Sequence, residues 1–353
     1  MGLLNSNNKK FFSIDGSYGE GGGSILRLST AFSVLTQKPI RVYNIRKNRP
    51  KPGLRTQHLV GLKTLADISQ GKLSESGVGT TEIFFEPGEI KGGTFNIKIP
   101  TAGSIGLLLQ AIQIACVNVK SEIQLNIDGG ATFGLWAPTL LYLHNITFML
   151  LERMGFKTEV KVLKEGFYPK GGARANVLIK PTRTIRPIQL NKQGSIEVIE
   201  GVSIASNFLR NRNVAERQAK KASKLIKNYL KIPCDIQIRY ADTLSPGSGI
   251  CLWLKTDSGV ILGSDIIGEK KVSAETVGQK CAEFLINMYN SKATSDTFLS
   301  DQILPYMALA NGKSEFLTPS FTNHAKTNIW LLEQFINKKF HVEKMKNLNK
   351  ISC

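Results

Sequence analysis

Two stretches of this chain repeat one order of secondary-structure elements, and this recurrence constrains the fold more than any other feature. Apolar periodicity in the first stretch predicts a helix, a strand, a second helix and a pair of strands, at 24–35, 40–45, 57–68 and 81–99. The second stretch repeats this order at 104–117, 123–127, 139–154 and 158–179. Both strand pairs carry Lys-Gly-Gly at the entry to the second strand, where glycine tolerates a positive φ. We therefore predict duplicated α/β units.

The chain changes in character after Pro181. A basic helix at 214–230 and a second helix that ends near Met288 accompany predicted strands at 196–206, 235–240, 250–254 and 260–263. From about Asp296 the order of helix, strand, helix and strand resumes, and its last helix begins at His324. We predict that 184–292 is an inserted α/β domain and that 1–183 and 293–353 together form the main domain.

The formal charge of +19 on 353 residues favours polyanionic partners, which are nucleic acid, nucleotides or an anionic membrane surface. A solvated, lysine-rich surface accounts for part of this excess. The longest apolar run, 105–119, is interrupted by Gln110 and Gln113, so we expect no membrane-spanning segment. The first six residues, MGLLNS, match the short myristoylation pattern, which sequences often match by chance.

The five cysteines are widely spaced and include no Cys-x-x-Cys pair. An odd number of isolated cysteines is typical of reduced thiols rather than of a disulfide framework or a zinc site. We therefore expect a cytoplasmic protein.

A glycine-rich segment, GSYGEGGGSILR at Gly16–Arg27, lies between a predicted strand and a predicted helix, where backbone amides can bind phosphate. It departs from Gly-x-Gly-x-x-Gly because Ser24 stands at the third position, and the GKS at 312–314 has Met307 in place of the P-loop glycine. A dinucleotide fold and a P-loop enzyme are thus disfavoured. Glu20 within this turn would repel phosphates unless a divalent metal lay between them. Alternatively, Glu20 complements the dipole of the following helix.

The stretch RVYNIRKNRPKPGLRTQHLVGLKT, at 41–64, contains seven basic residues and no acidic one. Its proline- and glycine-rich turn allows Arg46, Arg49 and Arg55 to converge on one site, where guanidinium groups suit phosphate oxygens. The alternative is a solvated basic loop. We interpret a second basic stretch, at 210–228, as a solvated helix face.

The four histidines differ in their surroundings. His144 lies within a predicted helix and His341 in a terminal strand, so we interpret both as structural. Nucleotidyl-transferring enzymes often attach AMP to the lysine of Lys-x-Asp-Gly, but the nearest match here, SIDG, has Ser13 instead. His324 follows Thr-Asn at a predicted helix start, where the helix dipole favours an attached phosphate and a neutral imidazole can act as a nucleophile. A capping or core histidine is the alternative, and His58 is the other candidate.

Six stretches together resemble the RNA 3'-terminal phosphate cyclase family over nearly the whole chain: DGSYGEGGGSILR, IRKNRPKPGLRTQH, EGFYPKGGA, SNFLRNRNVAERQ, DTFLSDQILPYMALA and NHAKTNIWLLEQF. The resemblance implies an α/β (α+β) fold of repeated βαβαββ units like those of enolpyruvyl transferases, with a smaller α/β domain inserted and the main domain catalytic. It also implies an ATP-dependent enzyme that converts an RNA 3'-phosphate end to a 2',3'-cyclic phosphate, through enzyme-AMP and RNA-adenylate intermediates.

The resemblance further implies roles for individual residues. His324 would be the nucleophile, and Glu20 a carboxylate linked to a divalent metal, Mg²⁺ or Mn²⁺. Phosphates of ATP or of the RNA end would be held by Arg27, Arg46, Arg49, Gln57 and His58. The nucleotide would be held by Gln110, Phe298, Leu299, Ser300, Asp301 and Gln302. Phe298 stands where the family often has tyrosine and keeps an aromatic face for adenine, and Ala173 replaces the third glycine of the PKGG turn.

Two other functions compete with this interpretation. A cyclase-like ribosome-assembly protein keeps the fold and binds RNA without catalysis, but the retained His324, Glu20, Arg46 and Arg49 argue against it. A small-molecule enolpyruvyl transferase would share the repeated units but not the histidine motif. We expect RNA 3'-phosphate ends and ATP as partners, no membrane, and leave a homodimer open.

Overall fold

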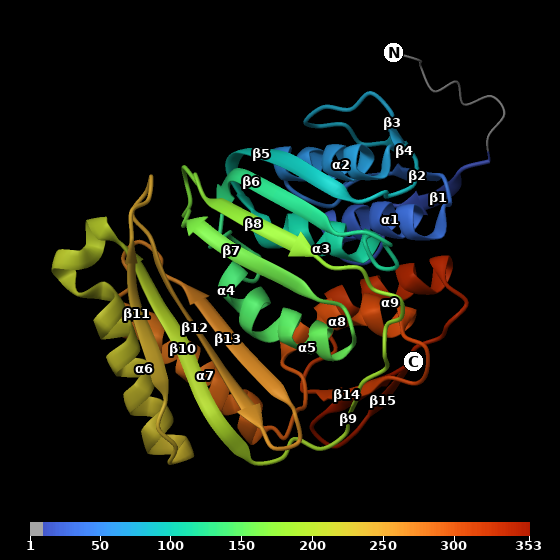
Figure 1. Ribbon diagram of the computed structural model, residues 1–353. Helices are drawn as coiled ribbons and strands as arrows, with labels where there is room; N and C mark the ends of the chain where they lie inside the picture. Colours follow the sequence, from blue (N-terminus) through green and yellow to red (C-terminus); the bar gives the residue numbers. More distant parts are fainter. Residues whose placement is uncertain (1–9) are drawn as a thin grey trace.

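The structure is a computed structural model that describes residues 10–353. The pattern MGLLNS and the first nine residues of the predicted main domain lie outside this described part. Residues 10–353 form four sheets of four strands each, with helices packed on them (Figure 1). Three of these sheets share one topology, and the fourth belongs to the predicted inserted segment.

The first unit contains one parallel strand pair followed by antiparallel pairs. Its sheet has the order β1-β2-β4-β3, in which only β1 and β2 are parallel. The predicted helices 24–35 and 57–68 and the strand 40–45 are confirmed to within two residues. In chain order the elements are β1 (Phe12–Asp15), α1 (Gly23–Thr36), β2 (Ile40–Tyr43), α2 (Thr56–Ser69), β3 (Lys72–Leu73) and β4 (Ile83–Glu86).

The second unit repeats this topology with longer strands. Its sheet has the order β5-β6-β8-β7, again with a parallel first pair and antiparallel later pairs. The predicted helix 139–154 contains a π-helical turn, η1, between two short α-helices. The elements are β5 (Gly93–Ser104), α3 (Ile105–Ala115), β6 (Ile123–Ala131), α4 (Leu140–Tyr142), η1 (Leu143–Thr147), α5 (Phe148–Arg153), β7 (Thr158–Lys164) and β8 (Arg174–Ile179).

A third unit with the same topology is split along the chain. Its sheet has the order β15-β16-β14-β9, and β9 and β14 form its parallel pair. The inserted segment separates β9 from the rest of the unit. The elements are β9 (Gln189–Leu190), α8 (Thr297–Leu309), β14 (Glu315–Thr318), α9 (Asn323–Phe335), β15 (His341–Lys344) and β16 (Asn349–Ser352).

One predicted strand pair is wrong. The stretch 81–99 was expected to form one hairpin of the first unit, but β4 pairs with β2 and β3, whereas β5 pairs with β6 of the second unit. Positive φ angles of 87° at Gly92 and 119° at Gly93 accompany the change of sheet. The Lys-Gly-Gly at 91–93 therefore links two units, while the similar sequence at 170–172 lies between the paired strands β7 and β8.

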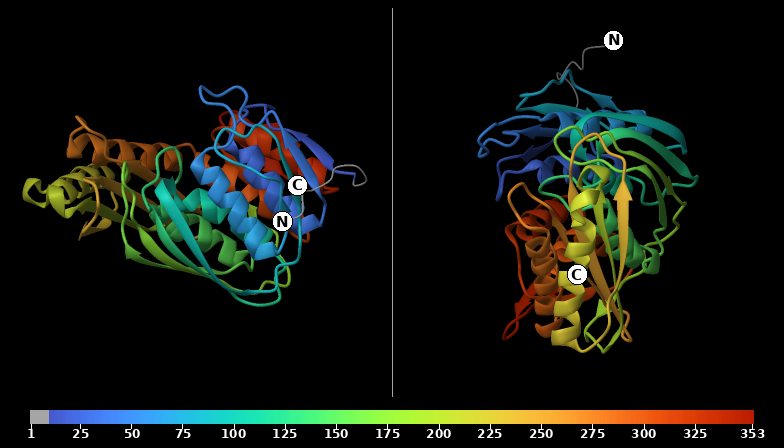
Figure 2. Two further views of the ribbon diagram at one scale, coloured as in Figure 1. Left: turned by 90° about the horizontal axis from the view of Figure 1, so that it is seen from above. Right: turned by 90° about the vertical axis from the view of Figure 1, so that its left-hand side faces the viewer.

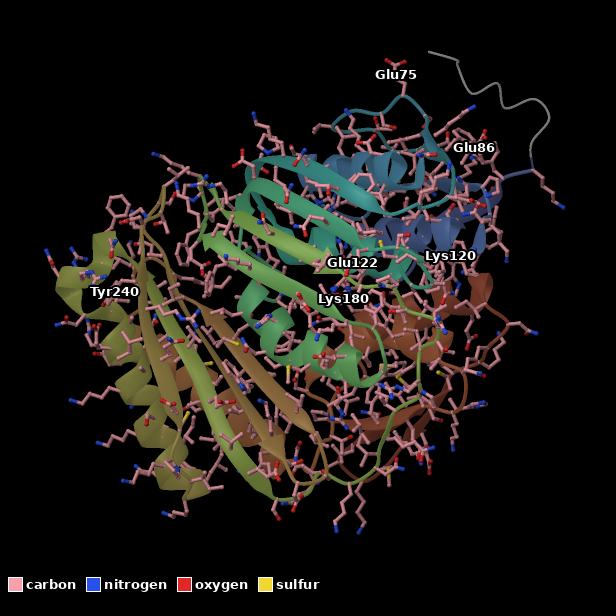
Figure 3. The ribbon with its side chains drawn as sticks, viewed as in Figure 1. Glu75, Glu86, Lys120, Glu122, Lys180 and Tyr240 are labelled. Atoms are coloured by element: carbon pink, nitrogen blue, oxygen red, sulfur yellow. The ribbon has the colours of Figure 1, made fainter. Side chains whose placement is uncertain are left out.

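The inserted segment forms its own sheet, with the order β11-β10-β12-β13, and its helices α6 and α7 pack together on it. The predicted helix 214–230 coincides with α6. Figure 2 shows this unit at one end of the molecule, and Figure 3 places Tyr240 of β11 on the opposite side from Glu86 of β4. The elements are β10 (Ile196–Ser206), the 3₁₀-helix η2 (Asn207–Arg212), α6 (Val214–Leu230), β11 (Asp235–Ala241), β12 (Ser248–Thr256), β13 (Ile261–Ile267) and α7 (Ala274–Asn290).

The domain limits 184–292 stay a prediction. Because β9 pairs with β14, we propose that the inserted unit is better limited to the chain between β9 and α8. The likeness to enolpyruvyl transferases also stays a prediction.

Helix α1 joins the three repeated units. It contacts α2, α3 and α9, which come from the first, second and third units. Ile25 and Phe32 are fully buried on it, and the Phe32 ring lies 5.8 Å from that of Phe335 on α9. Burial of such side chains supplies the main favourable free energy of folding. The glycine-rich turn at the start of α1 is therefore placed where all three units meet.

The five cysteines are free, and Cys116, Cys251 and Cys281 are buried. This agrees with the expected reduced thiols. None of the helices within residues 10–353 is both long enough and apolar enough to cross a membrane.

Candidate active site

The turn between β1 and α1 holds the start of α1 against an imidazole and a guanidinium group. A Cβ atom on Gly23 would lie 2.4 Å from His58 Nε2, and one on Gly22 would lie 3.0 Å from Arg49 Nη2. A larger residue at Gly23 would displace the imidazole. Gly22 caps α1 without a side-chain hydrogen bond, so the backbone N–H groups of the first turn have no side-chain acceptor there. Such a helix start favours an anion.

His324 and Glu20 meet at this turn, although 304 positions of sequence separate them. His324 is the second residue of α9, which begins at Asn323 as the sequence predicted to within one residue. Its Nε2 lies 3.0 Å from Glu20 Oε2, and an Arg49 nitrogen lies 3.5 Å from the same oxygen. Glu20 Oε2 is buried and accepts no hydrogen bond of good geometry from the described residues. The oxygen is therefore available to a further donor or cation.

The surroundings keep the His324 imidazole neutral. Burial lowers its pKa; the Glu20 charge opposes this shift, and Arg27 and Arg49 reinforce it. A neutral imidazole retains a lone pair on one ring nitrogen, as a nucleophile requires. About half of the His324 side chain is exposed, so a ligand can reach it.

Three contacts hold the glycine-rich turn and the start of α1 on α9. Tyr18 stacks on Trp330 with ring centroids 3.8 Å apart and an angle of 12° between the rings. Ser24 Oγ donates to Asn328 Oδ1 over 2.8 Å, and both side chains are buried. A Cβ atom on Gly19 would lie 2.3 Å from Thr327 Oγ1. This close packing fixes Glu20 relative to His324.

His58 is buried and offers a single hydrogen-bond donor towards α1. Its Nδ1 accepts from the Arg55 backbone N–H at 3.1 Å, and a pKa lowered to about 3 keeps the ring neutral. Burial is the main cause of this shift, and the charges of Arg27, Arg46 and Arg55 add to it. Because Nδ1 is an acceptor, the proton is on Nε2, beside Gly23.

Arg27 lies beside His58 and reaches towards α3. One of its terminal nitrogens donates to Gln110 Oε1 at 3.4 Å, and burial lowers its pKa to about 10, so the group stays charged. Arg27 Nε is buried and has no hydrogen-bond partner among residues 10–353. Gln57 lines the same small cavity as Arg27 and His58. The structure thus brings together Arg27, Gln57, His58 and Gln110.

Arg49 and Arg55 of the arginine-rich loop lie within electrostatic range of Arg46, and the convergence of all three on one ligand stays a prediction. Arg46 donates to the backbone oxygens of Lys51 and Gly53 at 2.7 and 2.9 Å, so it holds the loop. Burial and the charges of Arg55 and Arg49 lower the Arg46 pKa. Such repulsion between neighbouring cations is relieved when an anion binds among them.

Helix α8 contributes Phe298 and Asp301 beside α9. The Phe298 side chain is 40% exposed, and its ring stacks on Phe284 with centroids 5.4 Å apart. Asp301 accepts from Thr322 Oγ1 at 2.7 Å. Burial raises the Asp301 pKa to about 7, and the charge of Glu20 adds to the shift, so the two carboxyl groups lie within electrostatic range.

The other members of the 298–302 segment face the protein interior. Leu299 and Ser300 are fully buried, and Gln302 accepts from Thr147 Oγ1 at 2.9 Å. Their side chains support α8 in this structure. Phe298 and Asp301 are the members of the segment that a ligand can reach more directly.

A divalent metal can be tested against these carboxyl groups. Within the described part of the chain, no group of three or more His, Cys, Asp or Glu side chains is arranged to hold a metal ion. Mg²⁺ is commonly bound by one or two carboxylates together with substrate phosphates. Glu20, whose buried Oε2 accepts no hydrogen bond from the described residues, and Asp301 fit this second arrangement.

Sequence reasoning missed several residues that shape this site. Thr322 caps α9 through Ala325 N–H and also binds Asp301. Its position before an apolar helix is an N-cap signal that was available in the sequence. Asn328 and Tyr18 gave no such signal, because their partners lie far away along the chain.

Comparison with known proteins gives the family. The sequence model described as RNA 3'-terminal phosphate cyclase matches residues 18–342, a range that contains every candidate residue named above. A curated protein of that name from Methanopyrus kandleri is 41% identical over 328 residues, which cover 92% of each chain. The chain belongs to the RNA 3'-terminal phosphate cyclase family.

Two further cyclase relatives of the same name are equally similar. The one from Pyrococcus furiosus is 42% identical over 330 residues, which cover 94% of each chain. The one from Methanosarcina barkeri is 42% identical over 339 residues, which cover 96% of this chain and 98% of the relative. The resemblance that the sequence motifs indicated is thus confirmed at the level of the family.

Proposed function

We propose that this chain is an ATP-dependent RNA 3'-terminal phosphate cyclase, a ligase that forms a 2',3'-cyclic phosphate through AMP attached to His324. The observation that carries this proposal is the meeting of a neutral His324 with Glu20 at an uncapped, arginine-lined helix start. Family membership supports the overall reaction. The assignment of individual residues is our own inference from their geometry.

In the first step, a ring nitrogen of His324 attacks the α-phosphorus of ATP. A phosphorus–nitrogen bond forms, the bond to the bridging oxygen breaks, and pyrophosphate leaves. The Glu20 carboxylate, 3.0 Å from the imidazole, orients the ring and stabilises the positive charge that develops on it. Arg49 and the N–H groups of α1 would bind the phosphates. Phe298 offers its exposed ring to adenine, and Gln110 contributes from α3.

In the later steps, AMP is first transferred to the RNA and then serves as the leaving group. An oxygen of the RNA 3'-phosphate attacks the AMP phosphorus and releases His324, which gives an RNA-adenylate. The neighbouring 2'-hydroxyl then loses its proton to solvent, attacks the 3'-phosphorus and displaces AMP. This last step is intramolecular, so it needs positioning more than further activation. Arg27, Arg46, Gln57 and His58 Nε2–H are the proposed positioning groups.

A divalent cation, Mg²⁺ or Mn²⁺, would supply charge neutralisation on the phosphates when bound. Glu20 and Asp301 are the residues that would hold it. We further propose a cytoplasmic location, which fits the five free cysteines, and leave a homodimer open.

Mass spectrometry of the intact protein tests this proposal. After incubation with ATP and Mg²⁺, the protein should gain the mass of one AMP, and the adduct should be lost in acid but survive base, as a phosphoramidate does. RNA with a 3'-phosphate should then remove the adduct and yield a 2',3'-cyclic end. A protein that binds RNA but never acquires AMP would instead be the non-catalytic, cyclase-like alternative.

A further inference from the structure

Trp136 presents a large apolar surface to solvent. Its side chain is 96% exposed, whereas Trp253 is buried and Trp330 is stacked on Tyr18. The Trp136 backbone has a φ of 56°, in the left-handed region that residues with a Cβ seldom adopt. An exposed tryptophan held in a costly conformation contributes little to stability, which directs attention to a binding role.

The segment that carries Trp136 is fixed at both ends. On one side, a Cβ atom on Gly134 would lie 2.5 Å from Ser104 Cβ, and one on Gly106 would lie 3.1 Å from the Pro138 carbonyl oxygen, so the segment packs on the start of α3. On the other side, the Tyr142 hydroxyl lies 2.7 Å from Asp296 Oδ1, and Asp296 caps α8. Trp136 therefore protrudes from a segment whose flanking residues are packed on α3 and bonded to the N-cap of α8.

Both contacts of the Trp136 segment are with helices that carry residues of the candidate active site. Helix α3 carries Gln110, and its first residues line the cavity that contains Arg27, Gln57 and His58. Helix α8 carries Phe298 close to its start. The Trp136 segment thus connects the two helices that carry proposed nucleotide-binding residues. We expect an RNA end, which extends beyond the nucleotide, to pass close to this segment.

An exposed indole ring favours a flat, apolar partner that can stack on it. Stacking of a nucleobase on an aromatic side chain stabilises single-stranded nucleic acid binding by about 1–3 kcal/mol, and every base offers such a face. Adenine of ATP already has Phe298, whose ring is backed by Phe284. The nucleobase that remains as a partner for Trp136 is therefore one of the RNA substrate.

We propose that Trp136 forms a nucleobase subsite on which a base near the RNA 3' end stacks. This inference rests on the proposed function for its substrate, but it concerns binding rather than chemistry. The subsite positions the RNA end relative to the phosphate-binding groups. Because every base has a flat face that can stack, the subsite does not select a sequence.

Two variants of Trp136 and one control test this subsite. Trp136→Ala should raise the KM for a short, single-stranded RNA 3'-phosphate about 10-fold, while AMP attachment to the protein stays at the parent rate. Trp136→Phe keeps a ring and should retain most of the affinity. Tyr229→Ala on α6 removes an aromatic side chain that is 68% exposed and lies in the inserted unit, so it should leave both measurements unchanged.

RNAs with one abasic nucleotide, placed in turn at each of the last three positions, locate the stacked base. One of them should bind the parent protein about 10-fold more weakly and should bind Trp136→Ala no more weakly than intact RNA does. Equal KM values for parent and Trp136→Ala would overturn the subsite. The subsite would also be overturned if every abasic RNA bound Trp136→Ala more weakly than intact RNA does. If Trp136→Ala acquired AMP more slowly than the parent protein, the ring would belong to the ATP site instead.

Direct binding separates this inference from the proposed function. RNA affinity measured without ATP, by fluorescence anisotropy, reports the Trp136 effect even if the protein never acquires AMP. Failure of AMP attachment with a retained Trp136 effect would refute the chemistry alone. Normal AMP attachment without a Trp136 effect would refute the subsite alone.

Discussion

Two regions of this molecule gather charged and polar side chains, and they differ in charge balance. The candidate active site combines Arg27, Arg46, Arg49 and Arg55 with the carboxyl groups of Glu20 and Asp301. A cavity of about 660 Å³ between the second and inserted units is lined by two cationic and three acidic side chains. The cations are Lys161 and Arg239, the acidic residues are Glu165, Glu200 and Asp235, and burial lowers the pKa of His144 beside them.

The comparison teaches that volume is a poor guide to chemistry in this fold. The larger cavity has ample room but no excess of positive charge, so a polyanion gains little there. The candidate active site is tightly packed, with glycines that leave no space for a Cβ, and it concentrates cations at a helix start. Shifted pKa values occur in both regions, at His58 and at His144, so they do not distinguish the two.

The largest expected effect is on AMP attachment, and it distinguishes the histidine of the candidate active site from the histidine of the larger cavity. His324→Ala should lower AMP attachment by about 1000-fold or more, because no other group replaces the nucleophile. The same variant should still cyclise RNA that already carries an adenylylated 3'-phosphate. His144→Ala, in the larger cavity, is the matched control and should label normally with α-labelled ATP. Full labelling of His324→Ala would move the search for the nucleophile to His58 or a lysine.

Glu20→Gln should reduce AMP attachment about 100-fold and weaken its dependence on Mg²⁺. The neutral amide stabilises a developing imidazolium less well and is a poorer ligand for a hard cation. A Mg²⁺ titration of the AMP attachment rate measures both effects. Glu165→Gln changes a carboxylate of the larger cavity and serves as the control. An unchanged titration would leave Glu20 as a partner of the helix dipole only.

Arg49→Ala should slow RNA phosphate activation by about 10-fold to 100-fold, since a charge-assisted contact contributes about 1.5–3 kcal/mol. Arg46→Ala should act in the same direction, in part because it loosens the loop. RNA affinity of the parent should fall as salt concentration rises, and both variants should show a shallower slope. Arg239→Ala tests the larger cavity in the same assay. Equal cyclisation rates for all four proteins would remove the arginine loop from the site.

The smallest expected effect is on stability and comes from Asp301. Its pKa in the folded protein, about 7, lies above the ordinary value of 3.8. Between these values the folded state binds more protons than the unfolded state, so the free energy of unfolding falls as pH rises through this window. Asp301→Asn should remove this fall and raise the free energy of unfolding at pH 8 by on the order of 2 kcal/mol. Urea unfolding at pH 5 and pH 8 measures it, with Asp235→Asn as an exposed control. If the free energy of unfolding of Asp301→Asn still fell between pH 5 and pH 8, another group would be titrating in this range.

Much of this architecture was predictable because it is encoded locally. Apolar periodicity predicted most helices. The family motifs predicted that His324, Glu20 and the arginine loop share one site, and the structure brings His324 and Glu20 together. Short elements were not predictable in this way. The two residues of β9 are too few for any periodicity, so the split third unit was only partly recognised.

Pairing between distant segments was also beyond the sequence. The strands β4 and β5 looked like one hairpin because local patterns do not say which sheet a strand joins. The bonds of Asp301 to Thr322 and of Ser24 to Asn328 depend on how α1, α8 and α9 pack. The setting of Trp136 depends in the same way on contacts of its segment with α3 and α8.

The split third unit also bears on the order in which the chain folds. Ile188 N–H donates to Ser314 Oγ across 126 positions, and closing so long a loop in a disordered chain is entropically costly. A prefolded inserted unit shortens the effective loop by holding its two ends in fixed positions. We therefore expect β14, α8 and α9 to assemble after that unit. Because Asp301 and His324 lie on these late elements, we expect the nascent protein to complete its candidate active site only when folding is nearly complete.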